Sequence, residues 1–117
     1  MAIAERAAGD VTIVAVSGDL TADSGIGVQL RDAVRHLLQV GHRKVVLDLA
    51  GAAHIDSTGL GEIVHAYAST TNKGGTLTLL RPSRRITELL TITKLRSVLE
   101  CYDSEAEALE AVAPRPG

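Results

Sequence analysis

Two neighbouring stretches, KVVLDL at residues 44–49 and HIDSTGLG at residues 54–61, determine the fold of this chain. The first is an apolar run that is too short for a typical helix and is β-branched at its start, a pattern typical of a strand buried on both faces. From the end of the second stretch onward, apolar residues recur at helical spacing at Leu60, Ile63 and Tyr67. The polar segment is therefore predicted to connect the end of a strand to the start of a helix.

This connection is the expected place for a functional site. In open α/β sheets, ligands and partners are bound beyond the carboxyl ends of the strands, because a crevice is left there. Ser57 or Asp56 is suited to cap the helix, and Gly59 and Gly61 allow the backbone to turn tightly. The N–H groups at the start of the helix have no partner within it, so they favour an anion nearby.

On both sides of this connection, the sequence predicts strands that alternate with helices. The predicted order is a weak edge strand at 2–6, a turn at 9–10, a strong strand at 11–16, a helix from about 26 to 40, the strand at 44–49, a helix that ends at 72–75, a strand at 76–80, a helix opened by Pro82 and Ser83, a last strand near 97–99, and a closing helix capped by Ser104 with Glu107 as its capping-box partner. This order predicts an α/β fold class with a single mixed, largely parallel sheet packed with about four helices. We expect one domain over residues 1–117, with a core of about 3–112 and a disordered tail at 113–117.

The composition argues against several classes of protein. Phe and Trp are absent, so the chain has few rings on which single-stranded nucleic acid could stack. A formal net charge of -2 gives no general attraction to DNA or to anionic lipid, so we expect neither direct nucleic-acid binding nor membrane binding. No apolar run approaches the roughly 18 residues of a membrane span, and no signal-peptide pattern is present, so a cytoplasmic location is expected.

Cofactor and metal binding are not expected. Cys101 is the only cysteine, so neither an internal disulfide nor a thiolate cluster is possible, and it is interpreted as a small apolar residue on a strand. The four histidines show no ligand spacing. His54, next to the motif, is expected to be a partly buried histidine with its hydrogen bonds satisfied, with a role in lining the site as the alternative. Arg84 and Arg85 are expected on the solvent side of their helix.

The residues of the motif do not match those of two common catalytic and nucleotide-binding motifs. A nucleophile elbow needs Gly-x-Ser-x-Gly, but Ile55 occupies the first glycine position, and no histidine follows late enough for the hydrolase order. A phosphate-binding loop would need Gly-Lys-Ser or Gly-Lys-Thr before a helix, which is also absent. Two interpretations of Ser57 remain. It is either an exposed hydroxyl presented for modification or a residue that only caps the helix. Leu60 is likewise either an exposed anchor for a partner or a core residue.

The block Asp56-Ser57-Thr58-Gly59-Leu60-Gly61, preceded by a strand with Leu47-Asp48-Leu49 and followed by Gly74-Gly75, resembles the STAS domain of bacterial anti-sigma factor antagonists. The resemblance covers roughly residues 3 to 112. It implies a binding protein and not an enzyme, with Ser57 phosphorylated by an anti-sigma factor that is an ATP-using serine kinase. In its unphosphorylated form the antagonist binds that kinase and frees a sigma factor, and a serine phosphatase resets it.

The resemblance also implies a partner-binding surface around Ser57 and a monomer or weak dimer. The residues expected on that surface are Asp19, Thr21, Asp23, Asp56, Ser57, Thr58, Gly59 and Leu60. One loop departs from the family pattern, because Gly18-Asp19-Leu20-Thr21 stands where many members have Gly-Glu-Leu-Asp, which leaves Asp23 as the candidate replacement acid. STAS domains also occur as scaffold subunits of stressosomes and as subunits of lipid-transport complexes, and these are the alternative functions.

Overall fold

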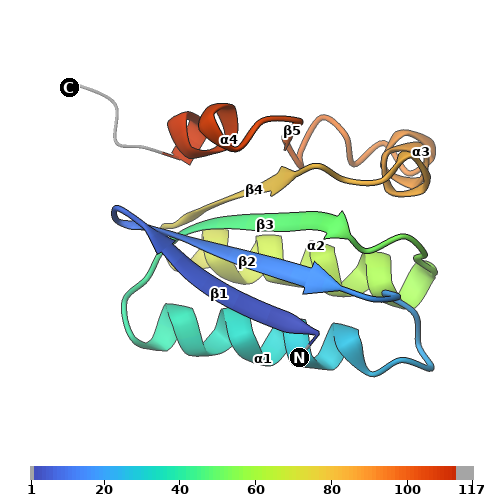
Figure 1. Cartoon of the computed structure of the whole chain (residues 1–117), viewed down its shortest axis with the longest axis horizontal. Helices are drawn as coiled ribbons and strands as arrows, with labels where there is room; N and C mark the ends of the chain where they lie inside the picture. The colour runs from blue at the N-terminus through green and yellow to red at the C-terminus, as the bar shows by residue number, and fades with distance from the viewer. Residues whose placement is uncertain (1, 113–117) are drawn as a thin grey trace.

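Five strands form one mixed sheet in the computed structural model, which describes residues 2–112 (Figure 1). In chain order the elements are β1 (Ile3–Ala8), β2 (Val11–Ser17), α1 (Ile26–Gln39), β3 (Lys44–Gly51), α2 (Ser57–Asn72), β4 (Thr76–Leu80), α3 (Arg84–Ile92), β5 (Cys101–Tyr102) and α4 (Glu105–Val112). The predicted fold class, a mixed and largely parallel sheet with helices packed on it, is confirmed.

The strands lie in sequence order, β1-β2-β3-β4-β5. The first two pair antiparallel through a tight turn at Gly9 and Asp10, while every later pair is parallel. Parallel pairing brings the carboxyl ends of β2, β3 and β4 to one edge of the sheet. The loop after β2 and the loop after β3 therefore leave the sheet together.

Strand β3 is buried on both faces, as its apolar run predicts. Val45, Leu47 and Leu49 pack in the larger core with α1, α2 and α3, whereas Val46 faces the smaller core beneath α4. Successive side chains of a strand point to opposite faces, so a continuous apolar run supplies both cores at once. Helices α1 and α2 run side by side on one face of the sheet (Figure 1).

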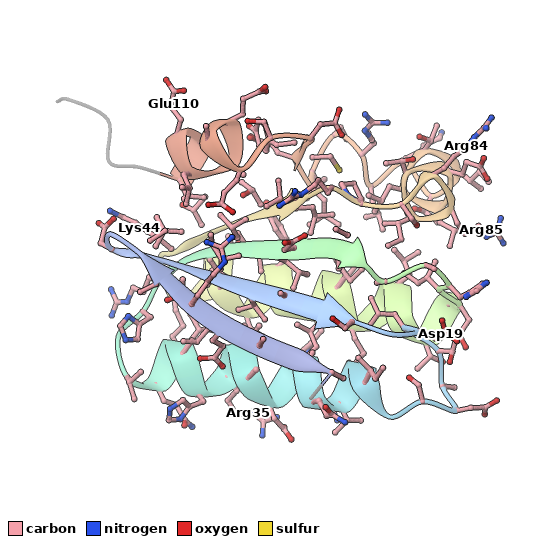
Figure 2. All side chains as sticks on the ribbon, viewed as in Figure 1. Asp19, Arg35, Lys44, Arg84, Arg85 and Glu110 are labelled. Carbon is pink, nitrogen blue, oxygen red and sulfur yellow. The ribbon has the colours of Figure 1, made fainter. Side chains whose placement is uncertain are left out.

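The predicted helix boundaries hold where a side chain caps the helix. The Ser83 hydroxyl accepts a hydrogen bond from the Ile86 N–H at the start of α3, and the Ser104 hydroxyl accepts one from the Glu107 N–H at the start of α4. These bonds satisfy amide groups that have no partner inside the helix. Arg84 and Arg85 extend from α3 into solvent as predicted (Figure 2).

The last strand is displaced from its predicted position near 97–99. The chain turns there instead, because the N–H groups of Val98 and Leu99 both bond to the Leu95 carbonyl. Leu99 is 1% exposed and fills the larger core, so its apolar character comes from a buried turn and not from a strand. Pairing with β4 begins only at Cys101, which is half-buried on the short β5. The predicted tail at 113–117 lies outside the described residues.

Candidate functional site

Two loops lie against each other at the carboxyl edge of the sheet. They hold half of the residues predicted to bind a partner, and the other half form the first turn of α2. The Leu20 N–H donates to the His54 carbonyl at 2.9 Å, and the Asp56 N–H donates to the Leu20 carbonyl at 3.2 Å. Leu20 and Ile55 thus form an isolated parallel bridge beyond the ends of β2 and β3. The pairing fixes the loop after β2, residues 18–25, against the segment that leads into α2.

Asp56 joins this loop to the start of α2. One carboxylate oxygen, Oδ1, accepts the Gly59 N–H at 2.9 Å as the N-cap of α2, and Oδ2 accepts the Ala22 N–H at 2.9 Å. Hydrogen bonds from the backbone N–H groups of Ala22 and Gly59 favour the charged carboxylate and lower the pKa of Asp56 below its ordinary value. Of the two predicted capping residues, Asp56 is therefore the N-cap. No pattern in the sequence indicated the bond to Ala22.

Gly59 is required by close packing. A Cβ atom built at this position would lie 1.9 Å from the carbonyl oxygen of Leu20, which is a backbone atom. The first turn of α2 therefore rests directly on the loop after β2, and only a residue without a side chain permits this contact. Leu60 is 9% exposed and belongs to the larger core, so the alternative of an exposed anchor does not apply to its side chain.

Ser57 and Thr58 are both exposed at the start of α2. Within residues 2–112, no hydrogen bond engages the Ser57 hydroxyl, because Asp56 takes the capping role. The hydroxyl is therefore open to solvent while the backbone on either side of it is fixed. The strand-to-helix connection presents the side chain, and the cap and the Gly59 contact hold it in place.

His54 is a correction to the sequence analysis. Its side chain is 77% exposed instead of partly buried, and its Nδ1 lies 3.0 Å from Asp19 Oδ1 across the two loops. Asp19 lies beyond the carboxyl end of β2 on the rim of the site (Figure 2). An exposed pair of this kind contributes little to stability, typically about 0 to 1 kcal/mol. It does place an imidazole and a carboxylate beside the motif.

The rest of the loop after β2 is wound tightly on itself. The Ser24 hydroxyl donates to the carbonyls of Asp19 and Thr21, and it accepts the N–H of Ile26 at the start of α1. Thr21, which stands where the family pattern has an acid, is half-buried, whereas Asp23 is exposed. The loop thus offers Asp19 and Asp23 to solvent. Whether these residues contact a partner remains a prediction.

Within residues 2–112, no group of three or more His, Cys, Asp or Glu side chains is placed to hold a metal ion. None of the helices in that range is both long and apolar enough to cross a membrane. The site itself presents an exposed hydroxyl at the start of a helix, flanked by carboxylates.

Comparison with known proteins points to one family. The STAS domain model matches residues 2–108. A Thermotoga neapolitana protein named as a homologue of an anti-sigma factor antagonist is 38% identical over 78 residues, which is 67% of this chain and 69% of that protein. The crystal structure of a Thermotoga maritima protein named as an anti-sigma factor antagonist superposes with a TM-score of 0.85 at 28% identity, covering 94% of this chain and 93% of the other. A phosphorylated Bacillus cell fate determinant shares the fold at 18% identity, with a TM-score of 0.74 over 96% of this chain and 100% of the other.

Proposed function

The chain belongs to the STAS domain family of anti-sigma factor antagonists, and we propose that it works there as a binding protein switched by phosphorylation of Ser57. Unphosphorylated, it binds an anti-sigma factor that is a serine kinase, and this binding frees a sigma factor. The phosphorylated form releases the kinase until a serine phosphatase resets it. The observation that carries the proposal is the exposed Ser57 hydroxyl, which makes no hydrogen bond to any described residue, on a backbone fixed at both sides.

In this reaction the chain contributes only the acceptor. The Ser57 oxygen attacks the γ-phosphorus of ATP held by the kinase, the bond to the β-phosphate oxygen breaks, the hydroxyl proton passes to a base of the kinase, and ADP leaves. An acceptor must reach into the active site of another protein without unfolding. The first residue of α2 meets that need, because its side chain points outward while Asp56 and Gly59 hold the turn.

Phosphate would change the surface more than the fold. It adds about 1.5 to 2 negative charges at the N-terminus of α2, where the helix dipole and the first amide groups tolerate an anion. The same charge stands beside the Asp56 carboxylate, which is ionised at neutral pH because its pKa is lowered. A partner that docks on this edge would then have to accommodate an added, unpaired charge, which typically costs an interface several kcal/mol.

Labelling with the partner kinase tests the acceptor. The protein is incubated with ATP and the anti-sigma factor kinase encoded near its gene, and the phosphate is located by mass spectrometry. Ser57→Ala should abolish the labelling, whereas Thr58→Ala, which removes the neighbouring exposed hydroxyl, should leave most of it. Full labelling of Ser57→Ala with the phosphate on Thr58 would show that the acceptor is wrongly assigned.

Ser57→Asp tests the switch itself. Affinity for the kinase should fall by a factor of about 100 or more in calorimetry, because a charge enters the interface. The melting temperature should move by only a few degrees, since a change at a helix end typically shifts stability by about 1 kcal/mol or less. Ser57→Ala should bind like the wild type. Binding of Ser57→Asp at wild-type strength, or loss of binding only through unfolding, would exclude this mechanism.

A further inference from the structure

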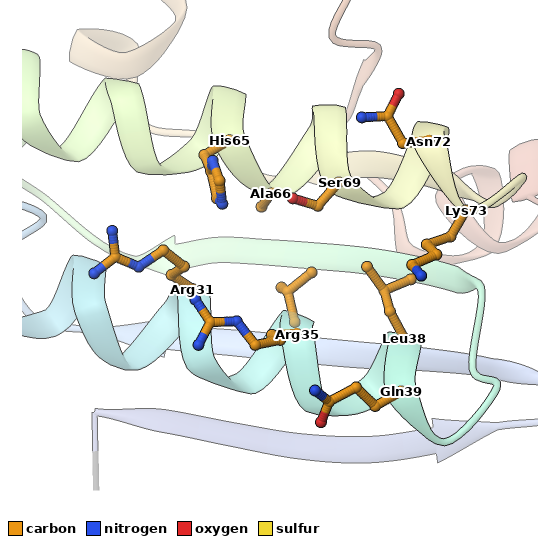
Figure 3. A pocket seen from close by; sticks show the side chains of 10 residues that line it. Arg31, Arg35, Leu38, Gln39, His65, Ala66, Ser69, Asn72 and Lys73 are labelled. Atoms are coloured by element: carbon orange, nitrogen blue, oxygen red, sulfur yellow. The ribbon is translucent and has the colours of Figure 1, made fainter.

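A cavity of about 380 Å³ lies between α1 and α2, away from the motif (Figure 3). Its apolar floor is formed by Val34 and Leu38 of α1 and Ala66 of α2. Volumes of roughly 300 to 1,000 Å³ with an apolar lining and a few polar groups are typical of small-molecule sites. The cavity is therefore large enough for a small organic ligand.

The rim of this cavity is basic. Arg31 and Arg35 approach it from α1, and His65 and Lys73 approach it from α2 (Figure 3). None of the ten residues that line it is acidic, although the chain as a whole carries a net charge of -2. Even with the carboxylates of Glu62 and Asp32 next to the two arginines, the rim keeps a small cationic excess, so the cavity favours an anion.

The donors on this rim are only partly engaged by the fold. Within residues 2–112, no hydrogen bond engages the side chains of the four basic residues, and the Nε atom of Arg31 is buried without a partner. Arg31 forms a long ion pair with Glu62 at 3.7 Å, and Arg35 forms one with Asp32 at 3.8 Å, so neither guanidinium holds a carboxylate at hydrogen-bond distance. The outer N–H groups of both guanidinium groups therefore keep donors that a ligand oxygen could accept.

We propose that this α1–α2 cavity binds a phosphate ester with a small apolar body. Two guanidinium groups and an ammonium group match the charge and the acceptor oxygens of a phosphate, since arginine binds phosphate through paired N–H donors and lysine binds it as a point charge. The apolar floor would hold the organic part. The proposal goes beyond the function of Ser57 and does not depend on it, because His65 lies eight residues along α2 from Ser57, or about 12 Å at the helical rise.

The test uses phenyl phosphate as the probe, with inorganic pyrophosphate and phenol as comparisons. Amide and side-chain chemical shifts of the isotope-labelled protein are followed by NMR as each probe is added to about 10 mM, a range that detects weak small-ligand affinities. Phenyl phosphate should give saturable shifts confined to residues of α1 and α2 around the cavity. Pyrophosphate and phenol should each bind more weakly, because one lacks the apolar body and the other lacks the charge.

Variants separate the cavity from general electrostatics. Arg31→Gln with Arg35→Gln should weaken phenyl phosphate binding by about tenfold or more, because two charged donors are lost. Lys73→Gln, at an exposed position, should weaken it several-fold and provides a test if the double variant is poorly folded. Arg84→Gln with Arg85→Gln removes the same charge from α3 and should change the affinity by less than about twofold.

Several results would overturn the proposal. These are the absence of saturation, shifts spread equally over all basic surfaces, an equal effect of the α3 variant, or pyrophosphate binding as tightly as phenyl phosphate.

Discussion

Replacing Gly59 by alanine should damage the site more than any other single methyl group added to the motif. The new Cβ would lie 1.9 Å from the Leu20 carbonyl oxygen and 2.7 Å from its carbonyl carbon, where an ordinary contact begins at 3.4 Å. Backbone atoms cannot rotate away as a side chain does, so α2 and the loop after β2 must separate by about 1.5 Å. That movement would break the hydrogen bonds between Leu20 and the segment 54–56.

The cost follows from these two effects. Overpacking of a rigid contact typically costs about 1 to 3 kcal/mol, and each lost hydrogen bond costs about 1 kcal/mol. Gly59→Ala should therefore lower the free energy of unfolding by about 3 to 5 kcal/mol, with a fall in melting temperature of more than about 10 °C. Gly61→Ala is the matched control, because no atom outside its neighbours lies within 4 Å of its Cβ and it sits inside the helix. That variant should gain up to about 1 kcal/mol from helix propensity.

Urea denaturation followed by circular dichroism measures both variants in the same buffer. The two alanines should shift the unfolding midpoint in opposite directions relative to the wild type. If Gly59→Ala unfolded within about 1 kcal/mol of the wild type, less than the expected overpacking cost, the direct packing of α2 on the loop would be wrong.

Three further outcomes are expected. Thr78→Val should raise the free energy of unfolding by up to about 1 kcal/mol, because the buried Thr78 hydroxyl has no hydrogen-bond partner within residues 2–112. Thr70→Val should lower it by about 1 kcal/mol, because the Thr70 hydroxyl donates to the Ala66 carbonyl at 2.8 Å. Urea titrations that give both variants the same sign would contradict this. The pKa of Asp56 is lowered in the fold, so its charged form stabilises the protein above its ordinary value of 3.8, and that stabilisation is lost as pH falls through the lowered pKa. The stability difference between wild type and Asp56→Asn should therefore stay constant above about pH 5 and shrink as the pH falls below 3.8, and a difference independent of pH would show that the carboxylate charge is not involved. Light scattering should report a monomer or weak dimer, while very large particles formed with related STAS chains would favour a scaffold function of stressosome type.

The sequence by itself determined the place of the motif and every helix and strand except the last strand. Three features act over only a few residues and can therefore be recognised in the sequence. They are the apolar run 44–49, the helical spacing after it, and the capping serines at positions 83 and 104. The same local logic placed Ser57 at the start of a helix, where the structure has it exposed. Local patterns suffice because side-chain period and capping depend only on near neighbours.

Tertiary structure alone decided how distant segments meet. The bond from Ala22 to Asp56, the exposed pair of His54 with Asp19, and the close contact of Gly59 with Leu20 each join residues more than 30 positions apart. The displaced last strand has the same origin. Leu99 is buried in a core formed by residues distant in sequence, so its apolar side chain does not mark a strand. These contacts depend on strand order and register, which bring loops together across the sheet, and no periodicity within a short window carries that information.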